Sequence, residues 1–438
     1  MTGNEGQRSR TPQAFRVIGR ALRHRNYRLF FFGQGISLIG TWLTRIATSW
    51  LVYRLTGSAL LLGVVGFAGQ IPTFVLAPFA GVFVDRTNRH RVLVVTQWLA
   101  CLQSGLLAYF TLRGTVTVHH VLALSIFQGL INAVDMPARQ SFVVQMVESR
   151  TDLPNAIALN SSMVNAARLL GPSIGGILIA AVGEGWCFAI DSASYLAVIA
   201  SLLAMRAIPD PPPLKIQRAR QALAEGFRYL AGFRPIAVIL GLLALISLLG
   251  MPYSVLMPIV AGQILHGGPH TLGWLMAAAG LGALCGALYL ASRQSVVGLE
   301  RVVGICAVGF GLALAAFSFS RVLWLSLPLV MLVGLFMMLE MAASNTVVQT
   351  LVDDDKRGRV MSFFAMAFFG TVPIGSLFAG ALADRIGAPY TILAGGIACV
   401  IAGVWYLQAL PRLNAVVRPI YVRLGILPGE ADAAPSGR

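Results

Sequence analysis

The sequence predicts an all-α polytopic membrane protein with twelve transmembrane helices in two pseudo-symmetric six-helix bundles. Apolar residues make up 57% of the 438 residues and charged residues only 11%, whereas a soluble domain carries about 25% charged residues. Twelve mainly apolar stretches each reach roughly the 20 residues that cross a bilayer. A polar segment at 206–235 separates six of these stretches from the other six.

Polar segments bound the two bundles. We expect a cytoplasmic N-terminal segment at 1–27, an N-terminal bundle at 28–205, a cytoplasmic linker at 206–235, a C-terminal bundle at 236–410 and a cytoplasmic tail at 411–438. The expected spans cover 28–52, 60–84, 91–112, 119–145, 154–181, 185–205, 236–262, 271–292, 300–320, 322–350, 358–383 and 388–410. The longest spans should tilt in the bilayer or protrude from it.

The basic residues predict the orientation. If the N-terminus is cytoplasmic, the connections on that side carry 27 of the 33 Arg and Lys residues, and the other side carries four. Because basic residues concentrate in cytoplasmic loops, we expect both termini in the cytoplasm. The strong preference for Arg over Lys is typical of a high-GC genome, which favours the bacterial cytoplasmic (inner) membrane. The net charge of +16 is distributed between apolar runs, which argues against nucleic acid as a partner.

The linker combines helix breakers with an amphipathic pattern. Pro209 and the run 211–213 stop the sixth span, because proline cannot continue a helix. Beyond them, four apolar residues fall near one helical face: Ile216, Leu223, Phe227 and Leu230. This pattern predicts a helix that lies on the cytoplasmic lipid surface.

The two halves match each other at a shift of about 205 residues. Asp135-Met136 aligns with Glu340-Met341, and the segment 171–175 resembles 370–375. A six-plus-six repeat around a polar linker resembles the major facilitator superfamily. The resemblance implies the major facilitator fold, in which substrate binds between the bundles near the midplane. The bundles then rock to expose the substrate to each side in turn.

A basic motif ends the second span and resembles the signature of that superfamily in the same loop. Its residues are Gly81, Asp85, Arg86 and Arg89. Asn88 stands where the family has its second glycine, and asparagine also tolerates left-handed backbone. The resemblance implies that Asp85 meets the positive N-terminal end of the eleventh span. It also implies that Arg89 pairs with Asp135 on the fourth span.

Such a clamp would hold the cytoplasmic gate closed. The alternative is a solvated basic loop that only determines the topology. The corresponding loop of the second half, 289–301, lacks the Asp-Arg pair. The run Asp384-Arg385-Ile386-Gly387 looks similar, but the order of the spans places it on the outer side, so we interpret it as a coincidental or structural turn.

The fifth span carries Gly-Pro-x-x-Gly-Gly just after an arginine. The residues are Arg168, Gly171, Pro172, Gly175 and Gly176. This run resembles the motif of proton-coupled antiporters that export drugs. Proline removes a backbone hydrogen bond and bends the helix, and the glycines let a neighbouring helix approach closely. Ordinary packing of small residues is the alternative interpretation.

The resemblance extends to one branch of the superfamily. The segments 26–30, 40–42, 50–58, 135–140 and 159–168 look like those of enterobactin-exporter-like proteins. This branch is also called the drug:proton antiporter-3 or transmembrane secretion effector family, and it exports siderophores, macrolides and other compounds. One position departs from many antiporters, because Ser125 replaces the arginine that is linked to proton transfer on the fourth span.

Ionisable residues inside the bilayer are costly and are therefore candidates for function. Arg45 and Asp191 lie at similar depth in the outer part of the first and sixth spans, so they are either a structural pair or a coupling site. Glu340 is the repeat-related counterpart of Asp135 and has no obvious basic partner in the sequence. Glu340, Asp135, Asp191 and Arg45 are therefore the candidates for proton coupling.

Polar stripes indicate which spans line the cavity. They recur at three- and four-residue spacing, as one helix face requires, on the first and fourth spans and in part on the seventh and tenth. The resemblance assigns these four spans to the cavity wall. The candidate residues are Gln34, Ser37, Thr41, Gln128, Asn132, Tyr253, Ser344 and Asn345.

These observations predict a secondary active transporter that exports small molecules by alternating access, by proton antiport. Uptake of a nutrient or lipid, and a non-transporting receptor on a transporter scaffold, remain the alternatives. The sequence shows no nucleophile–base set, metal-ligand spacing or phosphate loop, so we expect no enzyme activity, metal or cofactor. The expected partners are a small-molecule substrate, protons and the lipid bilayer, and the expected state is a monomer.

Overall fold

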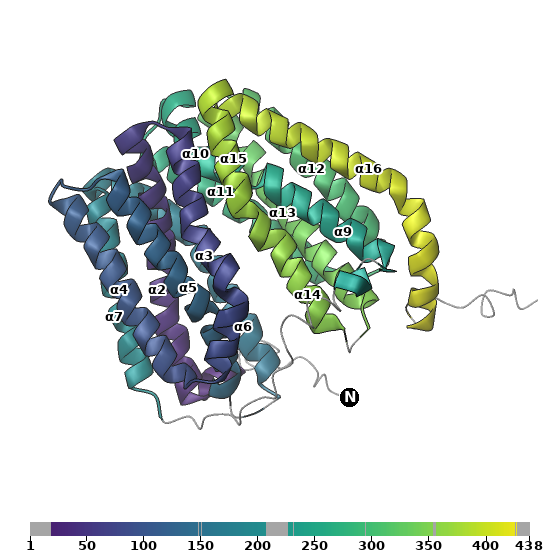
Figure 1. Cartoon of the computed structure of the whole chain (residues 1–438), viewed down its shortest axis with the longest axis horizontal. Coiled ribbons are helices and arrows are strands. Elements are labelled where there is room, and N and C mark those ends of the chain that lie inside the picture. Colours follow the sequence, from purple (N-terminus) through teal and green to yellow (C-terminus); the bar gives the residue numbers. More distant parts are fainter. Residues whose placement is uncertain are drawn as a thin grey trace, which may run out of the picture.

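The computed structural model describes residues 19–147, 149, 151–206, 227–230, 232–293, 295–353, 356–424 and 426, without the side chains of 77 and 78. The described part of the chain folds into helices and contains no strand. Two bundles follow each other in the sequence, and each forms one half of the molecule (Figure 1).

The N-terminal bundle contains six long helices after a short 3-10 turn, η1 (Arg20–Arg23). They are α2 (Arg25–Thr56), α3 (Ala59–Asp85), α4 (Arg89–Leu112), α5 (Val118–Met146), α6 (Leu153–Val182) and α7 (Glu184–Leu203). Side-chain caps define where several of them begin. Ser58 accepts a hydrogen bond from the N–H of Leu61, and Asn88 accepts one from the N–H of Arg91. Such caps satisfy donors that the first helical turn leaves unpaired.

The C-terminal bundle has two interrupted spans. The seventh span consists of α9 (Arg234–Leu245), the π-helical segment η2 (Ile246–Gly250), α10 (Tyr253–Ile259) and the π-helical segment η3 (Val260–Ile264). The eleventh span consists of α14 (Arg357–Ala365), the π-helical segment η4 (Met366–Gly370) and α15 (Thr371–Ile386). Prolines at 252, 258 and 373 follow the π segments or lie between them, and proline disrupts the regular backbone ladder.

The other spans of this bundle are continuous. They are α11 (Pro269–Ser292), α12 (Leu299–Phe319), α13 (Leu323–Leu351) and α16 (Ala388–Arg423). All twelve predicted spans therefore appear as helices or interrupted helices. Eleven of those described are both long and apolar enough to cross a membrane. The twelfth, α2, has 32 residues but is less apolar, because it carries Gln34, Arg45 and several hydroxyl side chains.

The last helix extends beyond its predicted end at residue 410. We expected a tail from 411, whereas α16 continues to Arg423 and bends on the way (Figure 1). Pro411 and Pro419 lie in this extension, in which Val417 and Tyr421 are buried. The predicted linker helix and the N-terminal segment lie largely outside the described residues. In the described turn at 227–230, Leu230 is buried and Phe227 is exposed.

The two bundles repeat the same helix pairing. In the first, α3 packs against α5 and α4 against α7; in the second, α11 packs against α13 and α12 against α16. Large apolar side chains such as Phe79, Phe378 and Trp324 are exposed on the helices, as a surface in contact with lipid requires. This arrangement is the two-bundle fold that the sequence predicted.

We call the end of the molecule where α2 begins the inner end, and the end at the α2–α3 connection the outer end. The extensive contacts between bundles join α3 to α15 and α6 to α11. Gly63 faces Gly380, and Gly176 faces Gly273, both toward the outer end. The bundles lean together at the top of Figure 1 and diverge toward the bottom, where α14 and the inner ends of α3 and α6 lie. This arrangement is closed at the outer end.

Candidate functional site

The α3–α4 connection holds the basic motif at the inner end. Asp85 ends α3, Arg86 is its C-cap, and Asn88 caps α4. Within this turn the Nη2 atom of Arg89 donates to Oδ1 of Asp85 at 3.0 Å. Gly81 lies one helical turn before Asp85 on α3. The acid of the motif is therefore paired within its own loop.

Asp135 has partners other than the one predicted. Thr96 and Gln97 on α4 donate to its Oδ1 atom at 2.7 and 2.8 Å, and Arg139, one turn away on α5, donates to Oδ2. The carboxylate is only 2% exposed. Thr96 lies seven residues beyond Arg89 on α4, which corresponds to about 10 Å along a helix. Asp135 is therefore too deep in the bundle to pair with Arg89 in this structure.

The acid at the end of the eleventh span contacts the opposite bundle. Asp384 accepts hydrogen bonds from the backbone N–H groups of Ala59 at 2.9 Å and Leu60 at 3.2 Å, and from the Ser58 hydroxyl at 3.3 Å. These are the first donors of α3. A carboxylate at a helix N-terminus satisfies free N–H groups and complements the positive end of the dipole. The run that we interpreted as a turn thus joins the two bundles at the outer end.

The sequence shows why this role was missed. Ser58 is a recognisable helix N-cap, but its partner lies 326 residues away. In the antiparallel pair of α3 and the eleventh span, each span ends in Asp-Arg, at Asp85 and at Asp384. Because the pair is antiparallel, the end of each span is aligned with the start of the other, and in this structure Asp384 contacts the start of α3. That reciprocity, rather than the motif alone, is the signal that identifies Asp384.

The Gly-Pro segment of α6 lies between two helices. An added Cβ at Gly171 would come within 2.3 Å of Trp42 on α2, and one at Gly175 within 3.3 Å of Leu43. On the other side, a Cβ at Gly176 would come within 2.8 Å of the backbone of Gly273 on α11. Each glycine of the motif therefore allows a close helix contact. Pro172 is buried in the same segment.

The predicted pair of Arg45 and Asp191 does not form in this structure. Asp191 accepts from Thr44 at 2.7 Å and from Ser104 at 3.0 Å, and it is 1% exposed. Arg45 instead extends over the ring of Trp42, with 5.0 Å between the guanidinium carbon and the ring centroid. Neighbouring residues on a helix point in different directions, so Thr44 and Arg45 face different surroundings.

Glu340 lies inside the C-terminal bundle. It is 1% exposed and accepts a hydrogen bond from Ser344 at 3.1 Å. Among the described residues it forms no ion pair. Ser344 stands where the first half has Arg139, since both follow their acid by four residues. Of the two repeat-related acids, Asp135 therefore has a cationic partner and Glu340 has only a hydroxyl.

The candidate cavity residues divide into exposed and buried groups. Thr41 is exposed, and Gln128, Asn132 and Asn345 are partly exposed. Gln34, Ser37, Tyr253 and Ser344 are buried. Ser37 lies on the α2 face of Gly33 and Gly40, which packs against α7. Two of the three candidates on α2, Gln34 and Ser37, are therefore buried inside their own bundle.

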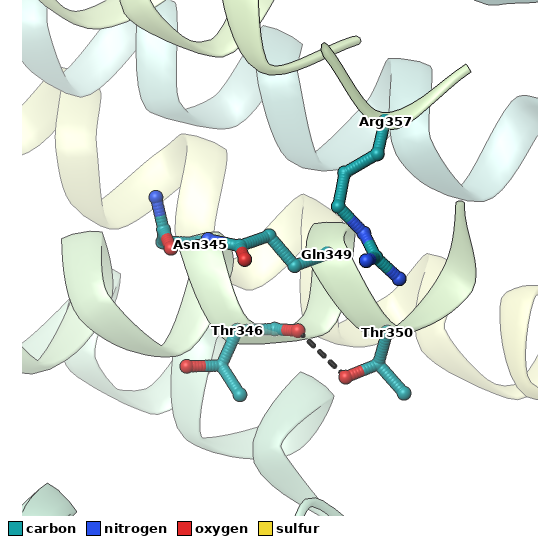
Figure 2. Close-up of a pocket in the computed structure, with 5 residues that line it drawn as sticks. All are labelled: Asn345, Thr346, Gln349, Thr350 and Arg357. Atoms are coloured by element: carbon teal, nitrogen blue, oxygen red, sulfur yellow. Dashed lines mark hydrogen bonds between the residues drawn. The ribbon is translucent and has the colours of Figure 1, made fainter. Parts of the chain in front are cut away.

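A pocket of about 390 Å³ opens at the inner end of α13. Figure 2 shows its lining, which is polar throughout: Asn345, Thr346, Gln349, Thr350 and Arg357. Thr350 donates to the carbonyl of Thr346 at 2.8 Å. The lining offers hydrogen-bonding groups and one cation at the end where the bundles diverge.

Comparisons with known proteins agree with this architecture. A sequence profile described as transmembrane secretion effector matches residues 20–419. The multidrug efflux pump Tap of Mycolicibacterium fortuitum is 28% identical over 88% of this chain and 96% of its own length. The staphyloferrin A transporter of Staphylococcus aureus is 24% identical over 85% of this chain and 93% of its own. The enterobactin exporter of Citrobacter koseri is 24% identical over 94% of this chain and 96% of its own length.

Solved structures share the fold at low sequence identity. A nucleoside transporter superposes with a TM-score of 0.68 and 15% identity, covering 89% of this chain and 99% of its own. A bacterial homologue of the iron transporter ferroportin superposes with a TM-score of 0.68 and 16% identity, covering 87% of this chain and 98% of its own. Both likenesses identify the transporter fold.

Proposed function

The chain belongs to the transmembrane secretion effector family of the major facilitator superfamily, and from this premise we propose that it exports small molecules across the bacterial cytoplasmic membrane by alternating access. Relatives over nearly the whole length are described as a staphyloferrin A transporter, a multidrug efflux pump and an enterobactin exporter. One chain contains both bundles, so we propose that a monomer completes the transport path.

The packing of α6 carries the proposal. Its Gly-Pro segment resembles that of exporting antiporters, and its glycines contact α2 on one side and α11 on the other. Movement of one bundle against the other therefore changes the contact between this segment and α11. A close helix contact without bulky side chains excludes solvent while it allows rocking.

The two states of the transport cycle differ in which end of the molecule is closed. We propose that the inner end is cytoplasmic, because 27 of the 33 basic residues fall on that side of the expected topology. In the present arrangement Asp384 holds the outer end closed. In the opposite state, the inner end closes and Asp85 caps the start of α14, with Arg86 and Arg89 in the same clamp.

Glu340 is our candidate for the proton carrier. An ionised carboxylate buried without a cation costs several kcal/mol, so a group that exchanges a proton is suited to this place. Asp135 and Asp191 each accept two or more hydrogen bonds within the N-terminal bundle, and Arg45 is stacked on an aromatic ring. We therefore propose Glu340 ahead of these three.

Export can be tested in inverted membrane vesicles. Vesicles with and without the protein are given carboxyfluorescein and ethidium as fluorescent probes, with and without an acid-inside pH gradient. We expect the protein to raise accumulation of at least one dye when the gradient is present. Equal accumulation with and without the protein contradicts export, and accumulation that ignores the gradient contradicts proton coupling alone.

A further inference from the structure

Two arginines within the membrane-spanning length have no acidic partner among the described residues. Arg45 on α2 is exposed and stacks on Trp42, and Arg168 on α6 is half-buried. The two arginines lie on helices that pack against each other, α2 and α6, and like charges in the same region repel. An arginine at this depth is costly unless something compensates its charge.

The acids inside the spans do not pair with these two arginines. In the described part of the chain, the acids more than one helical turn from the end of a span are Asp135, Asp191 and Glu340, each at most 2% exposed. Asp135 pairs with Arg139, Asp191 accepts from two hydroxyls, and Glu340 lies in the opposite bundle. The two arginines therefore give this region a positive charge that no described acidic side chain neutralises.

The arginines lie where the bundles meet. Trp42 packs against Gly171, one turn along α6 from Arg168, so it lies between the two arginines. The backbone of Arg168 faces Gly280 on α11, where an added Cβ would come within 3.3 Å of the Arg168 carbonyl oxygen. In the interrupted seventh span, α10 packs against both α2 and α11. Both bundles thus contribute to this place.

Resting on the proposed export function, we propose that Arg45 and Arg168 bind the carboxylate groups of an organic anion, which is the substrate class of this transporter. A guanidinium group binds a carboxylate through two parallel hydrogen bonds. A ligand with two or more carboxylates relieves the repulsion between the arginines. The ring of Trp42 offers an apolar surface beside them.

The proposal can be tested by equilibrium binding to the purified protein in phosphatidylcholine nanodiscs. The probes are radiolabelled citrate, benzoate and carboxyfluorescein as anions, and ethidium as a cation. The variants are R45Q, R168Q, R168K and R113Q. Arg113 lies outside the bundles after α4, where it stacks on Tyr109, so R113Q removes the same charge away from the site.

We expect at least one anion to bind more tightly than ethidium. R45Q and R168Q should each weaken that binding about tenfold or more, as loss of a charge-assisted hydrogen bond predicts, whereas R168K should retain part of it and R113Q all of it. Should R168Q fail to fold, R45Q and the preference of the unaltered protein for anions still decide the outcome.

Three results would overturn the proposal: no anion binds better than ethidium, the R45Q and R168Q variants bind the anion normally, or phosphatidylglycerol in the discs abolishes anion binding. The last would assign the site to a lipid headgroup. Binding at equilibrium needs no gradient, so a failure of export in vesicles is distinguishable from a failure of this site.

Discussion

At the scale of residues, Asp135 and Glu340 show how one neighbour changes what a buried acid can do. They occupy equivalent positions in the two halves, and each has its main partner four residues later on the same helix. Arg139 neutralises Asp135, whereas Ser344 gives Glu340 only a hydroxyl donor. A buried ion pair is suited to a fixed structural role, and a buried carboxyl without a cation is suited to exchange of a proton.

Replacing Glu340 with glutamine should abolish the response to the pH gradient. Glutamine preserves the shape and the hydrogen bond with Ser344 but cannot exchange a proton. We expect gradient-driven dye accumulation in inverted vesicles to fall to the level of vesicles without the protein, with normal expression. Glu300→Gln is the matched control, because Glu300 is also a buried acid of the C-terminal bundle. Full gradient-driven activity in the Glu340 variant would remove it as the carrier.

A second prediction at this scale concerns Tyr421. Its hydroxyl donates to Glu300 in the first turn of α12. Tyr421→Phe should therefore leave a buried carboxylate without that donor and destabilise the protein by about 1–3 kcal/mol. Thermal unfolding in detergent measures the effect. Tyr390→Phe serves as control because Tyr390 is 64% exposed; equal midpoints for the two variants would refute the role of this bond.

At the scale of elements, the spans were predictable and their ends were less so. Apolar runs of about 20 residues locate membrane helices because the bilayer has a fixed thickness. The extension of α16 was missed because the span was placed by its apolar stretch, which ends at residue 410, while Tyr421 and Val417 are held by packing that composition does not reveal. Likewise, the partners of Asp135 depend on how α5 places it beside Thr96 and Gln97 of α4, and the role of Asp384 depends on a helix in the other bundle.

The contact between α6 and α11 gives a prediction for one element. Gly176→Ala would place a methyl group within 2.8 Å of the backbone of Gly273 and Pro269, so the helices must separate. We expect the outer end to open. Spin labels are attached at Thr115 and Arg321, in outer loops of the two bundles. The distance between the labels, measured by electron paramagnetic resonance, should increase.

Gly241→Ala is the control for this experiment, because a Cβ there meets no atom within 4 Å. It should leave the distance distribution unchanged. An unchanged distribution in the Gly176 variant as well would mean that the contact can absorb the methyl group and does not hold the outer end closed.

At the scale of the whole molecule, alternating access is an equilibrium between two states that differ in which end is closed. Each contact that exists in only one state shifts that equilibrium by its own free energy. Asp384 joins α3 and α15 only while the outer end is closed. Glu184, also at the outer end, pairs with Arg54 within one bundle at 2.8 Å, so it should be insensitive to the state.

Asp384→Asn should therefore favour the state that is open at the outer end. A carboxylate at an exposed helix N-terminus contributes about 0.3–1 kcal/mol, which corresponds to a roughly two- to fivefold change in the ratio of states. The spin labels at Thr115 and Arg321 report that ratio, and Glu184→Gln should leave it unchanged. Because Asp85 is proposed to act at the inner end, Asp85→Asn should shift the ratio the opposite way. Shifts in the same direction for both variants would contradict reciprocal closure by the two Asp-Arg ends.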